Sequence, residues 1–167
     1  FIANWKMYGD LSSLNSIQRV IKFSKLNKSK KFKIVYCPPY TLLNQFITKV
    51  KKSSIDVGAQ NIHQNFDFGA NTGFINSKMV KNLGAKYVIL GHSENRELGE
   101  DNKHINKKIL SAIKSKLTVI FCIGETLSQR KKNKTKIILK NQINFGLKGV
   151  NKRNKIIFAY EPVWSIG

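Results

Sequence analysis

Residues that can transfer protons or hold negative charge follow the apolar runs of this sequence. In chain order these residues are Asn4, Lys6, His92, Ser93, Glu94, Glu125 and Glu161. Carboxylate, imidazole and ammonium groups are the side chains that enzymes use for proton transfer and for stabilising developing anions. Each residue alone has a structural explanation, because Lys6 is one of 26 lysines and a lone histidine often belongs to a core. Only their common placement indicates a site.

The apolar runs that precede these residues have the length of strands. They are continuous rather than alternating, which is typical of strands buried on both faces of a parallel sheet. The runs span residues 1–5, 32–37, 55–59, 87–90, 117–123 and 156–160.

Segments with helical spacing separate these runs, as in the series Ile105, Ile109 and Ala112. Ser77 and Asp101 stand where helix caps are expected, and Gly84 where a helix should stop. Strand and helix therefore alternate, which predicts a right-handed succession of βα units in one domain, residues 1–167.

Two architectures fit six such units of about 28 residues each, the open doubly wound sheet and the (β/α)₈ barrel. The open sheet normally has a glycine-rich turn after its first strand, but residues 5–10 contain a single glycine, Gly9. We therefore favour the barrel, in which the residues after the strands converge on one face.

Composition leaves one rival from another class. The net charge of +21 could mark a nucleic-acid-binding domain. However, 26 of the 30 cationic residues are lysines scattered along the chain, whereas base readers rely on arginine. No apolar stretch approaches the roughly 20 residues of a membrane span. Cys37 and Cys122 lie inside apolar runs, so we expect buried, reduced thiols and a cytoplasmic protein without membrane or nucleic-acid partners.

Five segments in order and spacing resemble the signature segments of the triosephosphate isomerase family. They are Asn4-Trp5-Lys6-Met7, Ala59-Gln60-Asn61, Gly91-His92-Ser93-Glu94, Cys122-Ile123-Gly124-Glu125 and Ala159-Tyr160-Glu161-Pro162-Val163-Trp164. The resemblance implies a (β/α)₈ barrel enzyme of glycolysis and gluconeogenesis that interconverts dihydroxyacetone phosphate and D-glyceraldehyde 3-phosphate through an enediolate. It also implies a homodimer and neither a metal nor an organic cofactor.

The resemblance also assigns roles to individual residues. It implies that Glu161 is the base, that His92 is a neutral electrophile and that Lys6 is a fixed cation. Asn4, Lys6 and Gly167 are the matching substrate-binding residues, and Thr72 lies in a loop that reaches a second subunit. Ser93, Glu94, Glu125 and Trp164 have supporting positions, with Glu94 orienting Lys6. His63 and His104 match no catalytic position.

Three positions depart from the family pattern. Tyr8 replaces an asparagine, Phe74 a glutamate and Asn95 the first of two arginines. That glutamate and arginine pair across the subunit interface in the family, so losing both leaves no buried charge without its partner.

Both ends of the sequence look cut, and we expect six of the eight βα units, with residues 1–167 inactive by themselves. A different sugar-phosphate isomerase or epimerase barrel is the nearest enzyme rival. The combination of Lys6, His92 and Glu161 counts against it.

Overall fold

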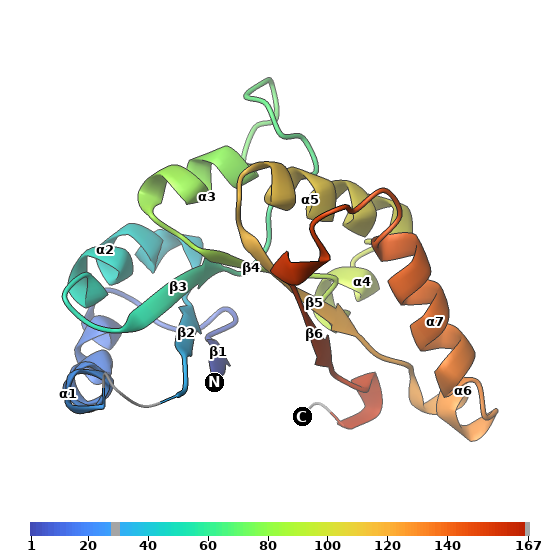
Figure 1. The fold of residues 1–167 in the computed structure, drawn as a ribbon, viewed down its shortest axis with the longest axis horizontal. Helices are drawn as coiled ribbons and strands as arrows, with labels where there is room; N and C mark the ends of the chain where they lie inside the picture. The colour runs from blue at the N-terminus through green and yellow to red at the C-terminus, as the bar shows by residue number, and fades with distance from the viewer. Residues whose placement is uncertain (28–30, 166–167) are drawn as a thin grey trace.

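A computed structural model describes residues 1–27 and 31–165, and it contains a curved sheet of six parallel strands (Figure 1). Neighbours in the sheet are also neighbours in sequence, so the strand order is β1 to β6. This order differs from that of a doubly wound sheet, in which the strand order reverses. The strands are β1 (Ile2–Asn4), β2 (Ile34–Cys37), β3 (Ile55–Ala59), β4 (Tyr87–Leu90), β5 (Thr118–Ile123) and β6 (Ile156–Tyr160).

Helices between consecutive strands cover the convex side of the sheet in Figure 1. The helices between strands are η1 (Ser12–Ile17), α1 (Gln18–Leu26), α2 (Tyr40–Val50), α3 (Ser77–Leu83), α4 (Ser93–Glu97), α5 (Asn102–Lys114), α6 (Leu127–Lys131), α7 (Thr135–Gly146) and η2 (Arg153–Lys155). The last helix, η3 (Val163–Ser165), follows β6. None of the helices within the described residues is long and apolar enough to cross a membrane.

The core has two parts, one on each face of the sheet. The larger part joins the sheet to the helices, with Phe46 of α2, Ile109 of α5 and Phe121 of β5 fully buried. The smaller part lines the concave face and includes Cys37 and Cys122. Both cysteines are free and buried, as expected from the sequence. Burial raises the pKa of Cys37 to about 12, so this side chain remains a thiol.

One helix cap differs from the sequence prediction. α3 begins with Ser77, and its cap is the preceding Asn76, whose side chain accepts a hydrogen bond from the Met79 backbone N–H. The Ser77 hydroxyl is buried and hydrogen-bonds the Ser111 hydroxyl at 2.9 Å instead. The expected cap at Asp101 and stop at Gly84 are confirmed, and Gly84 adopts the left-handed conformation with φ of 109°.

The expectation that every strand is buried on both faces is wrong for the two edge strands, β1 and β6. Ile157, Phe158 and Tyr160 are exposed, because β6 pairs only with β5 among the described strands. β1 likewise pairs only with β2. The described sheet thus has two unpaired edges, and both are apolar, because Phe1 and Ile2 at the β1 edge are exposed as well.

We predict that a polypeptide limited to residues 1–167 self-associates through these edges. Unpaired strand edges with exposed apolar side chains recruit other strands. Analytical ultracentrifugation measures this, with a chimera that appends the remaining third of a longer relative as the control. A monodisperse monomer that melts cooperatively would contradict the prediction.

Candidate active site

Lys6 leaves the carboxyl end of β1 in a left-handed backbone conformation, with φ of 52°. This conformation is uncommon for residues other than glycine. Two side chains hold it: Asn4 Oδ1 accepts from the Lys6 N–H at 3.0 Å, and Gln60 Nε2 donates to the Lys6 carbonyl at 2.8 Å. Gln60 Nε2 also donates to the Cys37 carbonyl at 2.9 Å, which ties the turn to β2. The Lys6 ammonium therefore projects from a fixed backbone.

Glu94 holds the other end of Lys6. Its Oε1 lies 2.9 Å from Lys6 Nζ, and the Lys6 side chain remains 36% exposed. The hydrogen bond from Lys6 lowers the pKa of Glu94, and the same bond raises the pKa of Lys6. The pair therefore stays ionised over the physiological pH range.

His92 is buried at the start of α4, with 5% of its surface exposed. Its Nδ1 accepts a hydrogen bond from the Glu94 backbone N–H at 3.3 Å. A nitrogen that accepts carries no proton, so the hydrogen of the neutral ring is on Nε2.

Glu161 follows β6 and approaches His92 from the opposite side. Its Oε2 lies 3.5 Å from His92 Nε2. This oxygen is buried and has no hydrogen-bond partner within the described residues, although the side chain as a whole is 37% exposed. A carboxylate oxygen without a donor is free to accept a proton.

Glu125, after β5, is a fully buried carboxylate with many donors. Trp164, Tyr160, Thr135 and Arg130 donate to it at distances of 3.1 to 3.5 Å. Burial alone would raise the pKa of Glu125, but the hydrogen bonds from Trp164, Tyr160 and Thr135 outweigh burial and lower it. Glu125 thereby fastens η3, which carries Trp164, to the end of β5.

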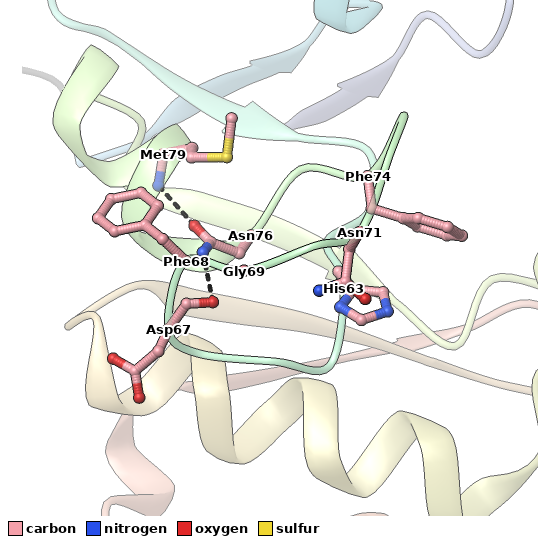
Figure 2. A pocket seen from close by; sticks show the side chains of 8 residues that line it. All are labelled: His63, Asp67, Phe68, Gly69, Asn71, Phe74, Asn76 and Met79. Carbon is pink, nitrogen blue, oxygen red and sulfur yellow. Dashed lines mark hydrogen bonds between the residues drawn. The ribbon is translucent and has the colours of Figure 1, made fainter.

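The loop of residues 60–76 between β3 and α3 carries the expected interface residue Thr72, which is exposed. The Asn76 side chain also donates to the Phe66 and Asp67 carbonyls at 3.2 Å, which closes the loop on itself. Figure 2 shows the bond to Asp67. His63 packs against Phe74 with 4.7 Å between ring centroids.

The structure thus brings Asn4, Lys6, His92, Ser93, Glu94 and Glu161 to one edge of the sheet, with Glu125 and Trp164 beside them. Gly167 lies outside the described residues. His104 Nδ1 lies 2.8 Å from Asp101 Oδ1, and Asp101 is not one of the site residues. Within residues 1–27 and 31–165, no group of three or more His, Cys, Asp or Glu side chains is placed to hold a metal ion.

Two features were not anticipated from the sequence. Arg96 of α4 donates to main-chain and side-chain oxygens near His92. Lys108 is buried on α5 and pairs with Glu100, and both contact Asn61 after β3. The burial of Lys108 could have been predicted, because it stands three residues after Ile105 and next to Ile109 on the apolar face of the helix.

Comparisons with known proteins agree on one family. The family model described as triosephosphate isomerase matches residues 1–167. A triosephosphate isomerase of Dictyoglomus thermophilum is 44% identical over 99% of this chain and 67% of its own length. One of Clostridium botulinum is 41% identical over 98% of this chain and 66% of its own. The crystal structure of triosephosphate isomerase from Bartonella henselae has a TM-score of 0.90 at 36% identity, covering 99% of this chain and 68% of that one.

We predict that Glu125 contributes stability in a pH-dependent way. Its pKa is lowered from 4.5 in the folded state, so its contribution is fully present above pH 4.5 and is lost as the pH falls through the folded-state value. Glu125→Gln should lower the Tm of the complete protein by about 3 to 10 °C near pH 7.

The difference in Tm between Glu125→Gln and the wild type should shrink in acid. Thermal melts from pH 7 to pH 3 measure it, with Glu97→Gln on the exposed side of α4 as the matched control. An equal difference at every pH, or none near neutrality, would exclude this account of Glu125.

Proposed function

Because the chain belongs to the triosephosphate isomerase family, we propose that the complete protein interconverts dihydroxyacetone phosphate and D-glyceraldehyde 3-phosphate. The family and its barrel fold confirm the resemblance and the isomerase class predicted from the sequence. The chain spans about two thirds of the length of the relatives it matches. The observation that carries the proposal is the approach of His92 and Glu161 at 3.5 Å beside Lys6.

In this proposal Glu161 takes a proton from carbon 1 of dihydroxyacetone phosphate. The electron pair of that C–H bond forms the carbon–carbon double bond of the enediolate, and the carbonyl oxygen gains the negative charge. A proton then moves from the oxygen on carbon 1 to the oxygen on carbon 2. Return of the first proton to carbon 2 leaves the carbonyl of the aldehyde at carbon 1. The Oε2 of Glu161 supports this role, because within the described residues no hydrogen bond occupies its lone pairs.

His92 and Lys6 would hold the charge that this step creates. The Nε2–H of neutral His92 donates a hydrogen bond to the enediolate oxygens, and the Lys6 ammonium stabilises the oxyanion and attracts the substrate phosphate. Asn4 supports Lys6 through its main chain, and Glu94 orients the ammonium. Gly167 would donate its N–H to the phosphate, and no metal or organic cofactor takes part.

The proposal also includes a homodimer in the cytoplasm. The loop of residues 60–76 would dock against a second subunit, with Thr72 near the partner's Asn4 and Lys6. The exposed Phe74 and Tyr8, with 61% and 75% of their surfaces accessible, support an apolar contact at this seam. Free buried thiols agree with a reducing compartment.

We predict that Glu161→Asp lowers kcat of the complete enzyme by about 100-fold or more while KM changes little. Shortening the side chain by one methylene moves the base away from the proton it must take. A coupled assay of triose phosphate isomerisation measures both constants, and Glu97→Asp is the control.

Turnover of Glu161→Asp within a few-fold of the wild type would rule out Glu161 as the base. Isomerisation or epimerisation of a longer sugar phosphate, with no activity on triose phosphates, would instead favour the rival barrel enzyme.

We predict that Phe74→Lys weakens the dimer and its activity together. The new charge would be buried without a partner in the seam. Sedimentation equilibrium and the isomerase assay over a range of protein concentrations measure the two effects, and Phe23→Lys on α1 is the control. A fully active monomer would refute the proposed role of this loop.

A further inference from the structure

The guanidinium of Arg96 joins three separate segments around His92. Arg96 Nε donates to the Gly91 carbonyl at 2.7 Å, Nη1 to the Asn102 side chain at 2.8 Å, and Nη2 to the Cys122 carbonyl at 3.3 Å. These acceptors lie at the end of β4, at the start of α5 and near the end of β5. One side chain thus connects two strand ends to the next helix.

The main chain of Arg96 adds a fourth contact. Its N–H donates to the His92 carbonyl at 3.1 Å, while its side chain holds the carbonyl of Gly91. The peptide groups on both sides of the His92 α-carbon are therefore bound to the same residue. The imidazole has little freedom left, since its Nδ1 is also bound by the Glu94 N–H.

The guanidinium of Arg96 packs closely against Gly91, the residue before His92. Gly91 adopts φ of 75°, and a Cβ there would lie 3.0 Å from both Arg96 Nη2 and the Cys122 carbonyl oxygen. A Cβ at position 91 would therefore require the guanidinium or the Cys122 carbonyl to shift from its present place. The glycine thus serves the close approach as well as the turn.

Burial lowers the pKa of Arg96, but a guanidinium keeps its proton in proteins. A half-buried cation that donates to main-chain carbonyls is costly unless its donors are satisfied. Lysine could not replace it, because a single ammonium cannot match acceptors arranged around a planar fork.

We propose that Arg96 is a positioning residue that sets where His92 Nε2 lies relative to Glu161. The catalytic part of this inference rests on the proposed isomerase function. The separation of His92 Nε2 and Glu161 Oε2 is 3.5 Å, and errors of about 1 Å in such arrangements can cost 100-fold in rate. Arg96 acts on this distance through the main chain of residues 91 and 92 and does not itself contact the substrate.

The test compares Arg96→Ala and Arg96→Lys with the wild type in the complete protein. Arg19→Ala, which removes an exposed arginine from α1, is the matched control. Steady-state kinetics give kcat and KM, and addition of free guanidinium ion tests chemical rescue of Arg96→Ala. The ¹⁵N chemical shifts of the His92 ring, recorded without substrate, report its tautomer and environment independently of turnover.

We expect kcat of both variants to fall by about 10-fold or more, with KM within about 3-fold of the wild type. Guanidinium should restore part of kcat in Arg96→Ala, and the His92 ¹⁵N signals should shift or broaden in both variants but not in Arg19→Ala.

Unchanged His92 signals would overturn the proposal, as would unfolding of both variants, which would indicate a purely structural role. A wild-type protein inactive on triose phosphates would refute the proposed function. In that case the His92 signals still decide whether Arg96 positions the ring.

Discussion

Parallel pairing of neighbouring strands is the constraint on which the candidate site depends. The register pairs Leu90 with Phe121 and Ile123 with Tyr160, so the chain leaves β4, β5 and β6 at the same edge of the sheet. His92 follows two residues after β4 and Glu161 one residue after β6. His92 and Glu161, which are more than 60 positions apart in sequence, therefore lie close together although neither is on a long loop. The helices on the convex side keep this edge in place by burying the side chains that β2, β3, β4 and β5 direct toward them.

Glu125 and Glu161 lie at the same edge of the sheet, but their different surroundings suit them to different functions. Glu125 is fully buried among four donors, and the hydrogen bonds lower its pKa, so it acts as a fixed anion that anchors η3. Glu161 has a buried oxygen with no donor among the described residues. A carboxylate held by several donors is a poor base, whereas one without them can take a proton. The proposed reaction needs a carboxylate such as Glu161 as the base. Glu125 contributes by anchoring η3 beside the site.

The sequence predicted the strands well because continuous apolar runs and strand burial are local signals, as in Tyr87–Leu90 and Ile156–Tyr160. It also placed the site residues just after the strands, which holds for all of them except Asn4, the last residue of β1. It missed contacts that depend on three-dimensional proximity: Asn76 rather than Ser77 caps α3, because the Ser77 hydroxyl reaches Ser111 on α5. Arg96 went unnoticed because its acceptors on β5 and α5 are distant in sequence. The exposed edges at β1 and β6 agree with the expectation that the chain holds only six of the eight βα units.

Proton transfer by Glu161 is the central step of the proposed reaction, and the proton that Glu161 carries can exchange with solvent. The direct measurement is ¹H NMR of dihydroxyacetone phosphate turnover by the complete wild-type protein in D₂O. A carboxylic acid proton exchanges with solvent, so the account predicts D-glyceraldehyde 3-phosphate that carries solvent deuterium at carbon 2 in a measurable fraction of molecules. Product that never carries solvent deuterium would indicate a direct hydride shift between the carbons, and the absence of product would remove the isomerase assignment. Either result would contradict the account.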